Sequence, residues 1–418
     1  MHDKNQKTKE YIILLVSMML NTFCTRVVNI IDLSMLKVVS TDASASLILM
    51  NNVTFIDFVA AFTFIPILGV MLSRSENQES SLGVFFKFGV KVIILTTISC
   101  AFVYPIQVCL SINDEVLMSL TLTFEIINLV YIPFKMAQFM MGNFLCVMKF
   151  SKYVSVYSII SIPADIILNT IFIRIFGPVG CMLSTLLICF CTCIVYFSIL
   201  DKKFSLIKNL KKNEKLPDDH KSFVAEFLRI LFEKGTDFVL FGIILINQSA
   251  ATISNIGLIL SITNLLLTQS TMSMRAIAIT SKTQNGKAIP YLKINLYFSV
   301  VISILFLALY RLVFNFVYKI NINDNQLWSS LLICIPCVII IDSISSVTRG
   351  RMQANLKFAR IFRIESIAQW TIYVPFLFML SAINRLELFG YALIALNLAE
   401  LVMYSLANIR QKSKMPTS

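Results

Sequence analysis

Long apolar runs, separated by short polar segments, make up most of this chain. A helix needs about 20 residues to cross the apolar core of a bilayer. Twelve runs qualify, near residues 11–36, 46–72, 84–110, 117–147, 153–174, 178–200, 223–246, 250–274, 291–318, 327–347, 361–381 and 387–408. Because the runs are continuous and do not alternate residue by residue, they favour helices over a membrane β-barrel. The pattern predicts an all-α integral membrane protein with twelve transmembrane helices.

The composition supports this prediction. Of the 418 residues, 57% are hydrophobic and 14% are charged, whereas a soluble protein has about 25% charged residues. A chain this apolar cannot cover itself with a polar shell in water. The first run, from Tyr11 to Leu36, is too long for a cleaved signal peptide and is predicted to be the first span.

Lysine and arginine gather in alternate loops, which predicts the orientation. They concentrate before residue 11 and within 149–152, 201–222, 282–293, 349–363 and 410–414. Because cytoplasmic loops carry the excess of positive charge in membrane proteins, both termini are predicted to be cytoplasmic, in a bacterial-type inner (plasma) membrane. The net charge of +13 follows from this topology, and no nucleic-acid partner is expected.

One long polar segment, residues 201–222, separates six runs from six. It is rich in lysine and contains Pro217. We interpret it as a cytoplasmic linker rather than a lipid-binding patch, because the lysines obey the positive-inside rule. The predicted division is an N-lobe (1–200), the linker (201–222), a C-lobe (223–408) and a cytoplasmic tail (409–418).

A short internal repeat supports two pseudo-symmetric six-helix lobes. Segment 142–152 resembles segment 350–360, which lies 208 residues later. The matched residues are Gly142 with Gly350, Lys149-Phe150 with Lys357-Phe358, and Lys152 with Arg360. The two segments follow the fourth and tenth spans, and repeats of this kind are common in transporters, with a substrate path between the halves. In this register Asp342 falls opposite Phe134.

Acidic residues inside the spans are the candidate functional groups, because an unpaired carboxylate in a membrane is costly. They are Asp32, Asp57, Glu125, Asp165, Glu233, Asp237, Asp342 and Glu365. Glu233 and Asp237 share one helix face. Close carboxylates suit a bound proton, and carboxylates near hydroxyl or carbonyl groups suit Na⁺. The alternative is a set of internal ion pairs with the bases Arg26, Lys91, Lys135, Lys234 and Arg275.

Other chemistry is not expected. The two histidines lie in polar segments, so a catalytic zinc site is not predicted. Most of the ten cysteines lie in apolar runs and are interpreted as packing residues. The short loops lack the His, Asp or Cys constellations of a membrane-embedded enzyme. We therefore predict no enzymatic activity and no cofactor beyond a coupling ion, H⁺ or Na⁺.

Several motifs occur in an order typical of one known family. They are Asp32 ahead of the small-residue stretch Ser40–Ser46, Gly69–Arg74 at the end of the second span, Asp165–Asn169 followed by Phe176–Gly180, Glu233 ahead of Ser249–Ala251, and Asp342 ahead of Arg349-Gly350. Over about residues 11–408 the chain thus resembles the multidrug and toxic compound extrusion (MATE) transporters. It departs from them in having no proline before Asp32 and in the inverted order Asp165-x-x-x-Asn169.

The resemblance implies two six-helix lobes in a V, alternating access, and export coupled to H⁺ or Na⁺. By the same resemblance, Asp32, Asp165 and Asn169 would form a cation site in the N-lobe. Glu233 and Asp342 would form the C-lobe site, and Asp237 lies one turn beyond Glu233.

The predicted function is a secondary active exporter that moves a small organic molecule, drug or peptide-like toxin out of the cell. Its substrate path is expected to include Arg26, Asn29, Glu125, Lys135 and Arg275. Because Arg26, Lys135 and Arg275 can bind a pyrophosphate, a lipid-linked oligosaccharide (O-antigen-type) flippase of the same superfamily is the alternative. A monomer in the lipid bilayer is expected.

Overall fold

The computed structural model describes residues 2–75, 77–210, 220–245, 248–281, 289–312, 326–383, 385 and 388–412. Within these residues the regular structure is helical throughout, as predicted. The helices are α1 (His2–Val39), α2 (Thr41–Val53), α3 (Ile56–Arg74), α4 (Gln78–Ser111), α5 (Glu115–Val147), α6 (Ser151–Phe176), α7 (Val179–Phe204), α8 (Leu206–Asn209), α9 (His220–Phe238), η1 (Val239–Ile244), α10 (Ala250–Leu266), α11 (Thr268–Thr280), α12 (Tyr291–Leu312), α13 (Gln326–Ala354), α14 (Phe358–Ala368), η4 (Gln369–Tyr373), α15 (Val374–Ala382) and α16 (Phe389–Lys412).

These helices join into twelve long runs within the described residues, one for each predicted span. Four of the runs combine elements: α2 with α3, α9 with the π-helical segment η1, α10 with α11, and α14 with π-helical η4 and α15. Ten stretches among the described residues are long and apolar enough to cross a membrane. The chain is therefore a multi-pass membrane protein.

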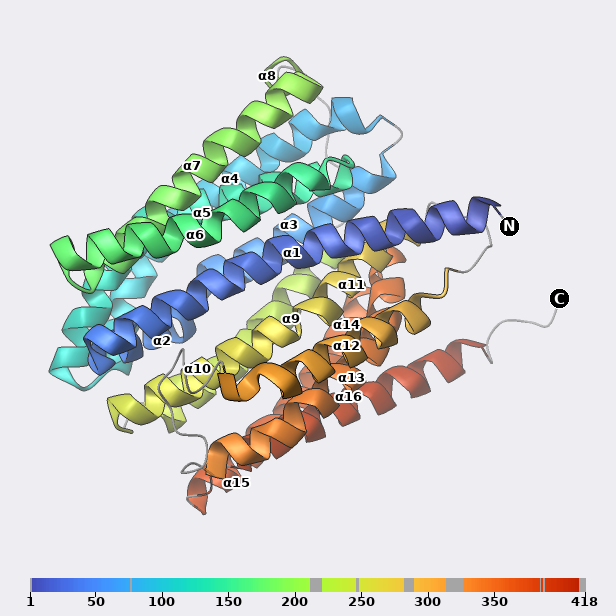
Figure 1. Cartoon of the computed structure of the whole chain (residues 1–418). Coiled ribbons are helices and arrows are strands. Elements are labelled where there is room, and N and C mark those ends of the chain that lie inside the picture. The colour runs from blue at the N-terminus through green and yellow to red at the C-terminus, as the bar shows by residue number, and fades with distance from the viewer. Residues whose placement is uncertain are drawn as a thin grey trace. The chain divides into compact units, whose positions relative to one another are not determined.

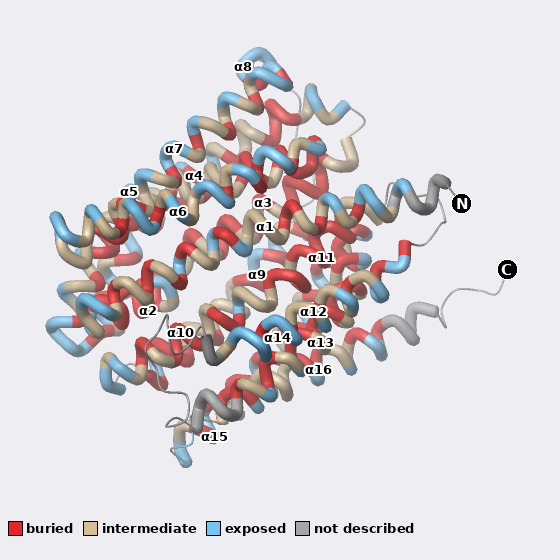
Figure 2. Tube along the Cα trace, viewed as in Figure 1, coloured by how far each residue is buried: buried red, intermediate tan, exposed pale blue. Residues whose placement is uncertain are grey.

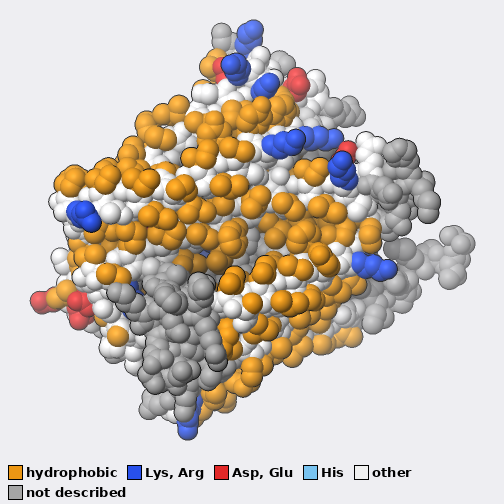
Figure 3. Space-filling model, in the orientation of Figure 1, with side chains coloured by type: hydrophobic (Ala, Val, Ile, Leu, Met, Phe, Trp, Pro, Cys, Tyr) orange, Lys and Arg blue, Asp and Glu red, His pale blue; other side chains and the backbone are white. Residues whose placement is uncertain are grey.

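The outer faces of the helices are apolar, as lipid contact requires. On α4, Leu95 and Phe102 are 68% and 73% exposed. Hydroxyl groups on the same helix bond to their own backbone, since Thr97 donates to the Ile93 carbonyl at 2.8 Å and Ser99 to the Leu95 carbonyl at 2.9 Å. Apolar side chains cover most of the face seen in Figure 3. Helices such as α3 and α11 are instead mostly buried (Figure 2).

The described residues fall into two compact units. The first, Ile12–Leu265, runs from α1 to α10, and in it α4, α5, α6 and α7 pack side by side (Figure 1). The second begins at Leu266 and includes the N-terminal residues up to Tyr11. In this unit α13 packs against α11, α12 and α16, and the Tyr11 hydroxyl donates to Asn295 Oδ1 at 3.0 Å. The two-lobe division expected from the sequence stays a prediction.

Local signals explain where the helices begin and end. Asp114 begins α5 by accepting hydrogen bonds from the amides of Val116 and Leu117 at 2.9 and 3.0 Å, and Ser40 caps α2 through the Ala43 amide at 3.2 Å. Gly177, with φ +65°, ends α6 in a conformation that only glycine adopts easily.

The turns after α5 and α13 have the same backbone geometry. Lys149 and Leu356, 207 residues apart, both have positive φ, and each turn closes with a bond from residue i+5 to residue i. These bonds run from the Phe150 amide to the Leu145 carbonyl at 2.8 Å and from the Lys357 amide to the Met352 carbonyl at 2.9 Å. The structure therefore corrects the repeat register from 208 to 207, because helix ends and not side-chain identities are repeated. Asp342 then corresponds to Lys135.

Candidate functional site

Three residues predicted as a cation site lie together in the first unit. Asp32 comes from α1, and Asp165 and Asn169 lie one turn apart on α6. The Asn169 amide donates to Asp32 Oδ1 at 2.7 Å and to Asp165 Oδ2 at 2.9 Å. All three side chains are buried, and Asp165 is 0% exposed. The inverted order of the acid and the amide on α6 still places both on the face that meets α1, because they are four residues apart.

Helix α7 completes this cluster with two hydroxyl groups. Thr185 donates to Asp32 Oδ2 at 3.1 Å, and Ser184 donates to Asn169 Oδ1. Among the described residues Asp165 Oδ1 has no hydrogen-bond partner, and neither carboxylate forms an ion pair. Two buried carboxylates with neutral neighbours favour a bound cation, which removes the cost of burying charge.

A second polar group links α3, α4 and α5. Lys135 on α5 forms an ion pair with Asp57 Oδ2 at 2.9 Å, and the Tyr104 hydroxyl donates to Asp57 Oδ1 at 2.5 Å. The Asp57 side chain is 4% exposed, whereas the Lys135 side chain is 38% exposed. Asp57 is thus held by two donors, and the lysine side chain is partly exposed.

Glu125 lies on α5 beside the break between α2 and α3. The Thr54 hydroxyl donates to Glu125 Oε2 at 3.0 Å, and the Asn128 amide donates to Oε1 at 3.0 Å. Glu125 is 1% exposed. Thr54 and Phe55 are the two non-helical residues of the break.

The acids of α9 are paired with bases of the same helix. Arg229 forms ion pairs with Glu226 at 2.8 Å and with Glu233 at 3.1 Å, and Lys234 pairs with Asp237 at 2.6 Å. Glu233 and Asp237 share a face as expected, but they pair with different bases, and Glu233 shares Arg229 with Glu226. Glu233 belongs to the first unit and Asp342 to the second. Their joint role as a coupling site stays a prediction.

Asp342 lies at the centre of a network in the second unit. Arg349, two turns further along α13, donates to Asp342 Oδ1 and, at 3.4 Å, to Glu365 Oε1 on α14. Ser270 on α11 donates to Asp342 Oδ2, and the Tyr404 hydroxyl donates to Glu365 at 2.8 Å. A base between two acids gives this cluster the form of an internal ion-pair network, the alternative that the sequence left open.

The remaining predicted path residues lie on two helices. Arg26 and Asn29 lie on α1 in the first unit, where Arg26 is partly buried and Asn29 is exposed. Arg275 lies on α11 in the second unit and is buried. Their contact with a substrate stays a prediction.

Partly exposed aromatic rings lie on α3 and on the α5 face that carries Lys135. Tyr131, Lys135 and Phe139 lie on one face of α5, with the Lys135 ammonium 5.8 Å from the Tyr131 ring centroid. Phe62 of α3 stacks on Phe139 at 5.1 Å and on Phe58 at 4.0 Å. We call Phe58, Phe62, Tyr131 and Phe139 the aromatic row. All four side chains are partly exposed.

Sequence reasoning missed several partners. Thr54, Tyr104, Ser184 and Thr185 were not identified, although each bonds to a predicted acid or to its amide partner. Ser184-Thr185 is a polar pair within an apolar run, which is a usable signal. Tyr104 offers none, because a tyrosine in a span is ordinary.

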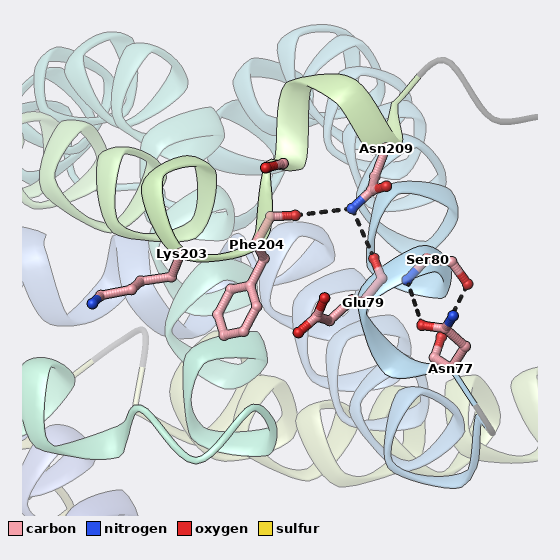
Figure 4. A pocket seen from close by; sticks show the side chains of 7 residues that line it. Asn77, Glu79, Ser80, Lys203, Phe204 and Asn209 are labelled. Atoms are coloured by element: carbon pink, nitrogen blue, oxygen red, sulfur yellow. Dashed lines mark hydrogen bonds between the residues drawn. The ribbon is translucent and has the colours of Figure 1, made fainter.

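The pocket in Figure 4 lies away from these acids, between α4 and α7–α8. It has a volume of about 230 Å³ and is lined by Asn77, Glu79, Ser80, Lys203, Phe204, Ser205 and Asn209. Asn209 donates to the carbonyls of Glu79 and Phe204 at 3.0 and 2.9 Å, which fastens α8 to α4. A Cβ at Gly83 would lie 2.5 Å from the Asn209 carbonyl oxygen, so this approach requires glycine. The pocket therefore reflects helix docking.

Comparison with known proteins gives a consistent likeness in structure alone. No family model and no curated protein matches the chain. A eukaryotic MATE transporter, AtDTX14, superposes with a TM-score of 0.76 at 12% identity, covering 97% of this chain and 96% of the other. The MATE multidrug transporter DinF-BH gives a TM-score of 0.75 at 15% identity, covering 97% of this chain and 95% of the other.

An outward-facing multidrug resistance MATE family transporter of the MOP superfamily gives a TM-score of 0.71 at 14% identity, covering 99% of this chain and 97% of the other. These likenesses extend over nearly the whole length of every chain compared. They confirm the fold that the sequence resemblance implied. The chain therefore has the fold of the MATE transporters.

Proposed function

We propose that this protein is a secondary active exporter of small organic molecules, driven by H⁺ or Na⁺. The observation that carries the proposal is the buried cluster of Asp32, Asp165 and Asn169, in which one amide donates to two carboxylates. Neither carboxylate forms an ion pair within the described part of the chain. The fold supports it, since the structural neighbours include the MATE multidrug transporter DinF-BH. The protein works in a cell membrane, with both termini on the cytoplasmic side, as a monomer.

In this mechanism the cluster alternates between two charge states. A proton on Asp165, or a Na⁺ between the carboxylates, removes one buried negative charge. The Na⁺ also gives Asp165 Oδ1 the partner that it lacks among the described residues. When the cation leaves, the two carboxylates repel each other across the α1–α6 contact. The arrangement in which α1 and α6 lie close together therefore binds the ion more tightly than the arrangement in which they move apart. This difference in affinity is what couples ion binding to a conformational change.

The substrate contacts the first unit along the aromatic row. Partly exposed aromatic rings bind planar apolar bodies, and they attract cationic groups through the ring faces. The partly exposed Lys135 side chain adds one polar contact. Drugs, dyes and peptide-like toxins with aromatic groups fit this wall, with Arg26 and Asn29 of α1 as further polar residues of the path.

The test is ion-driven transport by the purified protein in vesicles. A cationic rhodamine is loaded, and its movement is followed after an inward proton gradient, a Na⁺ gradient, or neither is imposed. We expect one of the two ions to drive export, and Asp32→Asn to abolish the driven component while the protein stays folded. Asp42→Asn, an exposed acid in the first turn of α2, is the control that keeps it. Undiminished driven export by the Asp32→Asn variant would show that the cluster is not the coupling site.

A further inference from the structure

Glu125 is a buried carboxylate that the mechanism above does not use. It is 1% exposed, and its two oxygens accept hydrogen bonds from Thr54 and Asn128 at 3.0 Å each. Among the described residues it forms no ion pair. Neutral donors alone offset little of the cost of burying a carboxylate.

The surroundings of Glu125 are rich in oxygen atoms. Thr121, Glu125 and Asn128 lie on one face of α5, at spacings of four and three residues. Thr121 is 0% exposed, and its hydroxyl has no hydrogen-bond partner among the described residues. A threonine in a helix usually donates to the carbonyl four residues earlier, which for Thr121 is that of Leu117. Here the Ser46 hydroxyl donates to that carbonyl instead, at 3.4 Å. A buried hydroxyl with an unused lone pair is thus placed one turn from the carboxylate.

The break between α2 and α3 places the C-terminal end of a helix dipole beside Glu125, which favours a bound cation. Helix α2 ends at Val53, and its C-cap Thr54 is the residue that donates to Glu125. A helix C-terminus carries partial negative charge on its last carbonyl groups. Interrupted helices in transporters use such carbonyl groups to bind cations inside the membrane.

The charge balance of the neighbouring groups also favours a cation. Glu125 interacts electrostatically with Asp57 of α3 and Lys135 of α5. Lys135 forms its ion pair with Asp57 at 2.9 Å, so one negative charge remains among these three groups when both acids are ionised. On α4, which packs against α5, Tyr104 is bonded to Asp57 and Cys100 is an uncharged neighbour at neutral pH.

We propose that Glu125, with Thr54, Thr121 and Asn128, binds a second monovalent cation, H⁺ or Na⁺. The site is distinct from the Asp32–Asp165 cluster, and the inference rests on the proposed ion-driven export. The Na⁺ form takes oxygen ligands from the carboxylate and the two hydroxyls, and the Asn128 amide turns its oxygen inward. The transport cycle then moves two coupling cations, one from each cluster.

The first test is cation binding by the purified protein, measured as the shift of the thermal unfolding temperature. Ligand binding to the folded state raises this temperature as the ligand concentration exceeds Kd. Na⁺ is exchanged for K⁺ at constant ionic strength, and pH is varied separately. The Asp32→Asn background removes the first cluster, so a remaining Na⁺-dependent or pH-dependent shift reports the second. We expect that shift to persist in Asp32→Asn and to vanish in Asp32→Asn/Glu125→Gln.

Two further variants distinguish the ion and protect the test against misfolding. Thr121→Val removes one oxygen without changing side-chain shape. It should raise the Na⁺ concentration needed for the shift in unfolding temperature by about tenfold. A pH-dependent shift should stay unchanged. Glu125→Asp keeps the charge and should retain a weaker response. Absence of any cation-dependent shift in the Asp32→Asn protein, or a shift that Glu125→Gln leaves intact, would overturn the proposal.

Transport stoichiometry supplies the second readout. The dye gradient at equilibrium is measured against the imposed ion gradient, and its slope gives the number of ions per cycle. Glu125→Gln should lower that number by one. Failure of wild-type export, with the binding shifts as expected, would overturn the proposed function and leave the cation site standing. Wild-type export with a slope unchanged by Glu125→Gln would overturn the second coupling site alone.

Discussion

The ion pair between Lys135 and Asp57 makes a quantitative prediction about stability. Removing one partner of a fully buried pair costs about 3–5 kcal/mol, whereas an exposed pair contributes about 0–1 kcal/mol. Here Asp57 is 4% exposed and Lys135 is 38% exposed, so the pair lies between these limits. For Lys135→Met we expect a loss of about 2–3 kcal/mol, because Asp57 stays buried with the Tyr104 hydroxyl as its remaining side-chain donor.

The opposite substitution is expected to cost less. Asp57→Asn removes the buried charge and leaves an accessible lysine, so we expect a loss of about 1 kcal/mol. The double variant Lys135→Met/Asp57→Asn has no unpaired charge and should recover most of the loss. The cycle of four proteins then gives a coupling energy of about 2–3 kcal/mol.

The assay is reversible unfolding by denaturant in detergent micelles, with Lys91→Met as the control. Lys91 is an exposed lysine on α4, and its substitution should change stability by less than about 0.5 kcal/mol. A coupling energy below about 0.5 kcal/mol, or a larger loss from Asp57→Asn than from Lys135→Met, would refute the reasoning.

Two further predictions concern other parts of the chain. Arg349→Met removes the base that pairs with the buried acids Asp342 and Glu365, so it should lower the free energy of unfolding by about 3–5 kcal/mol. The control is Arg351→Met, at an exposed position of the same helix. Equal losses of stability in the two variants would contradict the ion-pair network. Gly177→Ala should cost about 1–3 kcal/mol in thermal unfolding, because φ is +65° while nothing lies within 4 Å of the added Cβ. Gly142→Ala, which meets its nearest atom at 3.4 Å, should cost less, and the reverse order would count against backbone strain.

The helices and their spans were predictable because hydrophobic length depends on local sequence. Within the described residues all twelve runs appear near the expected positions, with 313–318 of the ninth run lying outside them, and the all-α membrane fold is confirmed. The break between α2 and α3 was not predictable. It falls at Thr54-Phe55, which contains neither glycine nor proline, whereas Pro66 and Pro133 lie within continuous helices. Neighbouring helices satisfy the backbone groups that a proline frees, so proline alone does not end a membrane helix.

The hydrogen-bond and ion-pair partners of the buried acids were harder to predict than the acids themselves. Eight acids were identified from their position in apolar runs, and three predicted residues meet in the Asp32–Asp165–Asn169 cluster. The buried acids Glu226 and Glu400 also lie in predicted spans and were missed. Asp57 and Lys135 lie 78 residues apart, and no local pattern joins them. Asp342 and Arg349 lie seven residues apart on one helix face, which could have indicated a pair. The sequence identifies costly groups, and only packing shows how each is neutralised.

The corrected repeat register has a consequence for comparing related sequences. Lys135 and Asp342 occupy equivalent positions in the two halves with opposite charge, and each is neutralised within its own half, by Asp57 and by Arg349. We expect the two pairs to covary separately across relatives. A chain that loses the base at position 135 should also lose the acid at position 57, without any matching change at 342 or 349. Each half of the protein can thus change its buried charges independently of the other.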